Sequence, residues 1–87
     1  MTNPVVVYAN NTCPYCAKAR KLLDQKLVTY TWHNIDQIPN GWQKVKDVSG
    51  RHTIPQIFIG DHHVGGCDEL YAAEKSGQLD ELLAKVK

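Results

Sequence analysis

The feature that most constrains this chain is the tetrad Cys13-Pro14-Tyr15-Cys16, which comes soon after an unbroken apolar run at residues 5–8. Proline is favoured at the first position of a helix, where its missing N–H costs no hydrogen bond. Cys13 then falls at the helix start, where unpaired backbone N–H groups and the positive end of the helix dipole favour a thiolate. Cys16 follows one turn later and is less exposed. The tetrad therefore predicts a strand, a loop and a helix that carry one attacking sulfur and one resolving sulfur.

Length and charge restrict the class of protein. With 87 residues, the chain is expected to form one domain, residues 1–87, with one modest core. A net charge of +1 favours neither nucleic acid nor an anionic membrane as a partner. No run approaches the roughly 18 apolar residues that cross a membrane, and Met1-Thr2-Asn3-Pro4 has no features of a secretion signal. We therefore expect a cytoplasmic protein and a monomer.

The number of cysteines bears on what the paired thiols do. Three cysteines are too few, and odd in number, for a disulfide framework. In a reducing compartment, a Cys-x-x-Cys pair is more often catalytic or metal-binding than structural. The cysteine count therefore points to chemistry at Cys13 and Cys16.

Hydrophobic periodicity predicts the order strand, helix, strand, helix, strand, strand, helix, helix. In the first helix Cys16, Ala19, Leu23 and Leu27 share one face. Strand, helix and strand within about thirty residues form a parallel βαβ unit. The helices must then cover both faces of a four-stranded mixed sheet, which predicts a thioredoxin-like three-layer α/β/α domain. The predicted elements span residues 5–8, 14–26, 28–35, 39–48, 56–59, 62–64, 67–75 and 79–86.

Taken together, the motifs resemble those of the glutaredoxin family, and most of all its small bacterial dithiol members. The matching stretches are residues 8–16, 50–59 with Thr53-Ile54-Pro55, and 65–70 with Gly65-Gly66-Cys67-Asp68. The resemblance implies a glutathione-dependent thiol–disulfide oxidoreductase that reduces protein disulfides and protein–glutathione mixed disulfides. Cys13 would be the nucleophile and Cys16 the resolving thiol. Glutathione would be the cosubstrate, with no bound cofactor and no metal.

The same resemblance implies a glutathione site. A cis bond before Pro55 would turn the Ile54 backbone toward the cysteinyl backbone of glutathione, as in strand addition. Gly66 would allow close approach of the γ-glutamyl carboxylate to the helix start. The Asp68 carboxylate would face the ammonium group. The residues implied to bind glutathione are Tyr15, Thr53, Ile54, Pro55, Gly66, Cys67 and Asp68.

One position departs from the family pattern. Many members carry a lysine three residues before the first cysteine, where it meets the glycine carboxylate of glutathione and supports the thiolate. Asn10 stands there in this chain. Arg51, Lys44 and Lys46 are the candidates to supply the missing cation, and ordinary surface charge is the competing interpretation of each.

Three other functions stay open at this point. A redoxin fed by thioredoxin reductase would share the fold and the Cys-x-x-Cys pair, but it would not need the Gly-Gly-Cys-Asp motif. A glutathione-ligated iron–sulfur cluster carrier would use Cys13 as a cluster ligand, although the second cysteine and the stiff Pro14 disfavour it. A zinc module needs four ligands, and the sequence has no second Cys-x-x-Cys.

Overall fold

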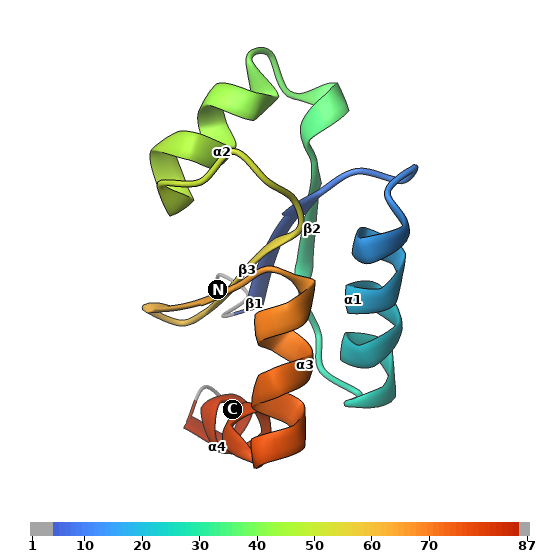
Figure 1. The fold of residues 1–87 in the computed structure, drawn as a ribbon, viewed down its shortest axis with the longest axis vertical. Helices are drawn as coiled ribbons and strands as arrows, with labels where there is room; N and C mark the ends of the chain where they lie inside the picture. Colours follow the sequence, from blue (N-terminus) through green and yellow to red (C-terminus); the bar gives the residue numbers. More distant parts are fainter. Residues whose placement is uncertain (1–4, 86–87) are drawn as a thin grey trace.

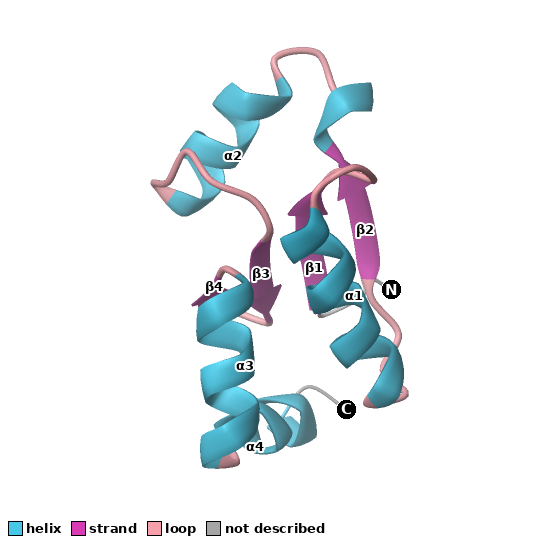
Figure 2. Ribbon diagram, turned by 45° about the vertical axis from the view of Figure 1, so that its right-hand side comes forward, coloured by secondary structure: helices cyan, strands magenta, loops and turns pink. Residues whose placement is uncertain are grey.

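The computed structural model describes residues 5–85, and Figures 1 and 2 show its architecture. The order of elements predicted from the sequence is confirmed, with one short 3-10 helix added after the second strand. The element order is β1 (Val5–Ala9), α1 (Pro14–Gln25), β2 (Thr31–Asn34), η1 (Ile35–Gln37), α2 (Gly41–Ser49), β3 (Gln56–Ile59), β4 (His62–Gly65), α3 (Cys67–Ser76) and α4 (Gln78–Lys85).

The sheet has four strands in the order β2-β1-β3-β4, so the first strand lies in its interior. β1 pairs in parallel with β2 and antiparallel with β3, and β3 pairs antiparallel with β4. The βαβ unit and the mixed sheet are therefore confirmed. Helices α1 and α3 lie together on one side of the sheet, and α2 lies on the other (Figure 1).

The core lies between the sheet and the α1–α3 layer. Alternate residues of β1 point into it, since Val5, Val7 and Ala9 are buried while the residues between them are only partly buried. This alternation is the two-residue period of a strand. Leu23 of α1 and Leu70 of α3 are fully buried in the same cluster. The core thus fixes the starts of α1 and α3 relative to the sheet.

Several predicted boundaries are wrong, and β2 differs most. The sequence predicts a strand over residues 28–35, whereas β2 covers Thr31–Asn34 and Ile35 opens the 3-10 helix η1. β2 pairs with β1 only from Thr31 to Asn34, opposite Val6 to Ala9, and residues 28–30 form no part of the strand.

The expectation for Leu27 is also wrong. Helix α1 ends at Gln25, and Leu27 has a positive φ of 57° and is 91% exposed rather than on the buried helical face. The end of α1 is instead held by Lys26, whose ammonium pairs with Glu74 and with Asp80 Oδ1 at 2.9 Å. This contact joins α1 to the C-terminal helices.

The remaining boundaries shift by two residues or fewer. The second helix begins at Gly41 because Asn40 adopts the left-handed conformation that precedes it. Strand β1 extends to Ala9, β4 to Gly65 and α3 to Ser76. Helix α4 begins at Gln78, and Val86, which the sequence places in this helix, lies outside the described residues.

Gly41 packs unusually closely against the segment before it. A Cβ atom added at Gly41 would lie 2.0 Å from the backbone oxygen of Ile35. No side chain can occupy that space unless the backbone moves. The close approach therefore couples the start of α2 to η1, and both lie in the connection from β2 to β3.

Candidate active site

The loop after β1 and the start of α1 position the thiol pair. Cys13 is the N-cap residue of α1, with φ −84° and ψ 124°, and Pro14 follows in the first turn, as predicted. Asn10 Oδ1 accepts hydrogen bonds from the backbone N–H groups of Thr12 at 3.2 Å and Cys13 at 2.9 Å. Asn10 therefore holds the loop that presents Cys13. This role was not predicted from the sequence; it is one that asparagine often takes in turns, where its side chain bonds to backbone two residues on.

The two thiols differ in exposure, and the buried one is a very weak acid. Cys13 is partly exposed, whereas Cys16 is completely buried against the core. Burial is the main cause that raises the pKa of the Cys16 thiol to about 12, and its hydrogen bond with the Cys13 sulfur and the charge of Cys13 raise it further. Cys16 is therefore a protonated thiol at neutral pH. This asymmetry suits one attacking and one resolving sulfur.

A cleft lies between the loop before β3 and the start of α3. All the residues that the sequence assigned to glutathione line this cleft, together with Arg51 and Glu69. The bond between Ile54 and Pro55 is cis, as expected. Cys13 and Cys16 are not among the lining residues, and Tyr15 joins their helix to the cleft. The lining residues are Tyr15, Arg51, Thr53, Ile54, Pro55, Gly66, Cys67, Asp68 and Glu69.

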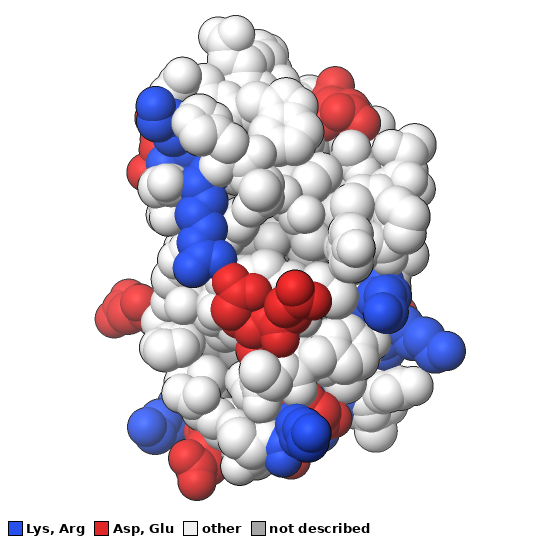
Figure 3. All heavy atoms as spheres, in the orientation of Figure 1, with Lys and Arg blue, Asp and Glu red and all other residues white. Residues whose placement is uncertain are grey.

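Arg51 is the one cation that lines this cleft among the described residues, and it pairs with Glu69. Figure 3 shows acidic side chains at the centre of the visible face, in contact with basic side chains. The hydrogen bond from Arg51 is the main cause that lowers the pKa of the Glu69 carboxyl, so Glu69 is ionised at neutral pH. Of the three cations considered from the sequence, Arg51 lines the cleft while Lys44 and Lys46 lie on α2.

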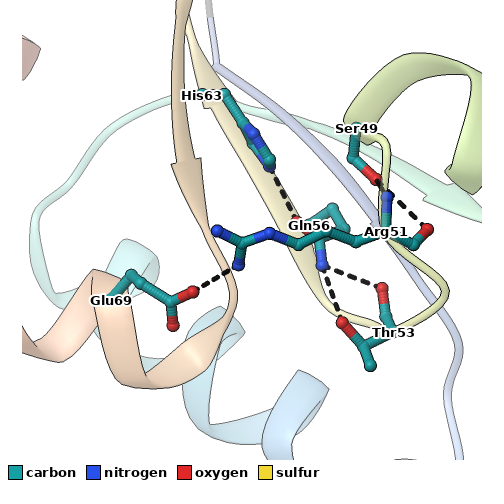
Figure 4. A network of polar contacts seen from close by, with 6 residues as sticks. All are labelled: Ser49, Arg51, Thr53, Gln56, His63 and Glu69. Carbon is teal, nitrogen blue, oxygen red and sulfur yellow. Dashed lines mark hydrogen bonds and ion pairs between the residues drawn. The ribbon is translucent and has the colours of Figure 1, made fainter.

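Two side chains, Gln56 and His63, connect Thr53 in the wall of the cleft to strand β4 by hydrogen bonds, and we call this connection the polar link (Figure 4). The fully buried Gln56 uses its amide nitrogen to donate to Thr53 O and Thr53 Oγ1, each at 3.0 Å. Its oxygen lies 2.8 Å from His63 Nε2. Because the amide nitrogen already donates, Nε2–H of His63 is the donor to this oxygen. Burial lowers the pKa of His63, so the ring is neutral at pH 7. The link joins β4 to Thr53.

Comparison with known proteins places the chain in a family. Residues 5–64 match the family model described as Glutaredoxin. The chain is 44% identical to "Glutaredoxin" of Pseudomonas aeruginosa over 93% of its length and 96% of that protein. The chain belongs to the glutaredoxin family. It is also 46% identical to "Glutaredoxin 3" of Escherichia coli K12, over 91% of this chain and 95% of that protein. Glutaredoxins are glutathione-dependent oxidoreductases, so the chain is an enzyme of this general class.

Solved structures agree with the fold. The chain superposes on the buckwheat glutaredoxin in its glutathione complex with a TM-score of 0.89, at 33% identity over 97% of this chain and 79% of that one. The fold is therefore the thioredoxin-like α/β fold predicted from the sequence. Within residues 5–85 of this glutaredoxin, no cluster of His, Cys, Asp and Glu is arranged to hold a metal ion. In the same range no helix is long and apolar enough to span a membrane.

Sequence reasoning missed three parts of this glutaredoxin site, namely the loop contact of Asn10, the partner of Arg51 and the link through Gln56. For Gln56 a signal was available, because a polar residue opens an otherwise apolar strand. For Glu69 the signal was weak, because an acidic residue in the first turn of a helix has an ordinary explanation in the helix dipole.

The difference between the thiols predicts selective alkylation of the reduced protein. At pH 8, iodoacetamide should modify Cys13 first, because thiolates are the reactive species and the pKa of Cys16 is about 12. Burial also raises the pKa of Cys67, so this thiol should react slowly. Peptide mass mapping after a time series measures the order. Early modification of Cys16 in folded protein would contradict the assignment.

Proposed function

We propose that this glutaredoxin reduces protein–glutathione mixed disulfides and protein disulfides, with Cys13 as nucleophile and Cys16 as resolving thiol. The observation that carries the proposal is the position of the thiol pair. A partly exposed Cys13 caps a helix, a buried Cys16 lies one turn behind it, and Tyr15 between them lines the cleft. The glutathione complex of the buckwheat relative supports glutathione as the ligand of this cleft.

In the monothiol route the Cys13 thiolate attacks the glutathione sulfur of a mixed disulfide. A bond forms between Cys13 and glutathione, the protein–glutathione bond breaks, and the protein leaves as a thiolate that takes up a proton. A second glutathione thiolate then attacks the sulfur of the bound glutathione. Oxidised glutathione departs, and Cys13 is again a thiolate. Cys13 is thus the nucleophile of the first step and the leaving group of the second.

In the dithiol route Cys13 first forms a mixed disulfide with a protein substrate. The negative charge on Cys13 is then lost, which removes two of the causes that raise the pKa of Cys16. Cys16 therefore becomes easier to deprotonate when its attack on the Cys13 sulfur is required. The reduced protein leaves, and two glutathione molecules reopen the Cys13–Cys16 bond in succession.

The cleft accounts for the preference for glutathione in this proposal. The backbone of Ile54 next to Pro55 pairs with the cysteinyl part of glutathione, and Thr53 forms the adjoining wall. The start of α3 at Gly66 and Cys67 receives the γ-glutamyl carboxylate. Arg51 supplies a cation for a carboxylate of the ligand, in place of the lysine that Asn10 replaces.

We further propose that the enzyme acts as a monomer in the cytoplasm. Both thiols and the lining residues of the cleft belong to one small domain, which is the unit proposed to act. Exchange with a glutathione pool requires a compartment that keeps thiols reduced.

A coupled assay tests the proposed function. The reduced protein is mixed with glutathione, glutathione reductase, NADPH and a small glutathionylated disulfide, and NADPH oxidation is followed. We expect turnover above the uncatalysed rate and reduction of a protein disulfide in a parallel assay. If the folded, reduced protein oxidises NADPH no faster than the uncatalysed reaction with either substrate, the proposal is wrong.

Replacement of Asp68 tests the ligand pose. Asp68 lines the cleft in the first turn of α3, and in this proposal its carboxylate pairs with the ammonium group of glutathione. We expect Asp68→Ala to raise the KM for the glutathionylated substrate by about tenfold, because it removes one charge-assisted contact. The reaction of Cys13 with iodoacetamide should change little. Asp61→Ala, in the exposed turn between β3 and β4, is the charge-matched control. An equal KM in both variants would mean that Asp68 interacts only with the dipole at the start of α3.

A further inference from the structure

The ion pair between Arg51 and Glu69 lies inside the cleft that the proposed function assigns to glutathione. We propose that Glu69 competes with glutathione for Arg51, so that the enzyme binds its ligand more weakly than the cleft allows. Glu69 is then a residue that sets affinity and specificity through Arg51. The inference rests on the proposed function and adds a residue role to it.

The pair contributes little to holding the fold together. The side chains of Arg51 and Glu69 are 48% and 43% exposed, and ion pairs this accessible to solvent contribute little to stability. The Arg51 backbone is anchored separately, since its N–H donates to Ser49 Oγ at 3.1 Å and this hydroxyl donates to Val45 O at 2.6 Å. The Arg51 side chain alone reaches across to α3 (Figure 4). It can therefore change partners without unfolding the loop.

The Glu69 carboxylate lies where a ligand carboxylate would bind. It folds back over the glycines before α3, because a Cβ at Gly65 would be 2.9 Å from Glu69 Oε1 and one at Gly66 would be 3.8 Å from Oε2. Arg51 is the main cause of the lowered pKa of Glu69, and the backbone N–H groups of Gly66 and Glu69 also favour the carboxylate. The ionised Glu69 therefore interacts with both groups proposed to receive the carboxylates of glutathione.

A count of charges gives the direction of the effect. Glutathione carries two carboxylates and one ammonium at neutral pH. The cleft is lined by one cation, Arg51, and by two acids, Asp68 and Glu69. Asp68 has a partner in the ammonium group, but Glu69 has none in the ligand. A ligand carboxylate that binds Arg51 must displace Glu69 or share the guanidinium with it, and in either case the Glu69 carboxylate lies beside an anion. Both effects weaken binding.

The test is the variant Glu69→Gln, which keeps the size of the side chain and removes its charge. In the coupled assay we expect the KM for the small glutathionylated disulfide to fall by about two- to fivefold, as for the loss of a competing exposed ion pair. The value of kcat should change less, because Glu69 does not contact the reacting sulfurs. High salt should reduce the difference between the two proteins. Glu81→Gln, an equal charge change on the exposed surface of α4, should leave KM unchanged.

The double variant Arg51→Gln/Glu69→Gln separates competition from simple repulsion. If Glu69 acts by occupying Arg51, the Glu69→Gln change should lower KM much less in the Arg51→Gln background. An equal fall in both backgrounds, a rise in KM for Glu69→Gln alone, or no change would each overturn the inference. Wild-type activity is measured in the same assay, so failure of the proposed function appears separately as a lack of wild-type turnover.

Discussion

Cys13→Ser should reduce glutathione-dependent turnover to the uncatalysed background with both substrate classes. The Cys13 sulfur forms a covalent bond in both routes, and a serine hydroxyl at the same helix start is not ionised at neutral pH and cannot form a disulfide. Cys16→Ser should keep reduction of the small mixed disulfide and lose most reduction of protein disulfides, because the monothiol route does not use the second sulfur. Initial rates with the two substrates measure the difference.

Comparison of the two variants also shows which cysteine is the nucleophile and which is the resolving thiol. Serine is close in size to cysteine, so both proteins should remain folded, which far-UV circular dichroism and the melting temperature Tm would verify. Substantial activity in folded Cys13→Ser, or loss of both activities in folded Cys16→Ser, would show that the two roles are assigned wrongly.

Gly41→Ala should be strongly destabilising, although helix propensity alone predicts the opposite. Alanine is favoured over glycine within helices by about 1 kcal/mol. The new Cβ, however, would lie 2.0 Å from the backbone oxygen of Ile35 and 2.9 Å from its Cβ. Overpacking against backbone costs about 1–3 kcal/mol or more. We expect the free energy of unfolding to fall by about 2 kcal/mol or more, and Tm by about 8 °C or more.

The control for this prediction is another alanine in the same helix. Lys44 is exposed on α2, so Lys44→Ala should change the free energy of unfolding by about 0.5 kcal/mol or less. Urea denaturation of the two variants and the parent gives the comparison. If Gly41→Ala is no less stable than Lys44→Ala, then α2 can move away from Ile35 at little cost.

The parts of the fold that depend on local signals were predictable from the sequence. Pro14 marks the start of α1, and the apolar run of β1 has the length and position of an interior strand. Boundaries set by pairing were not predictable in this way. Residues 28–30 have strand-like character, but β2 pairs with β1 only from Thr31 onward, which the local pattern does not reveal. The end of α1 depends on the conformation of Leu27 and on contacts of Lys26 with the C-terminal helices.

The same division holds for the candidate site. The residues assigned to glutathione all line one cleft, because the family motifs carry their positions. The interactions of these motifs with the rest of the chain were not predictable. Arg51 was one of three candidate cations, and only the packing of its loop against α3 shows that it meets Glu69. The contact between Gln56 and His63 depends on the register of β3 with β4, which includes an irregularity next to Phe58.

The interior position of β1 has a consequence for the protein during its synthesis. The two thiols of the Cys-x-x-Cys pair follow the first strand, but β3, which pairs with β1, comes about forty residues later and the start of α3 about fifty residues later. A nascent chain that has emerged only as far as α2 carries both thiols and lacks most of the residues that line the cleft. The cleft can therefore form only late in translation, when β3 pairs with β1 and α3 has been made.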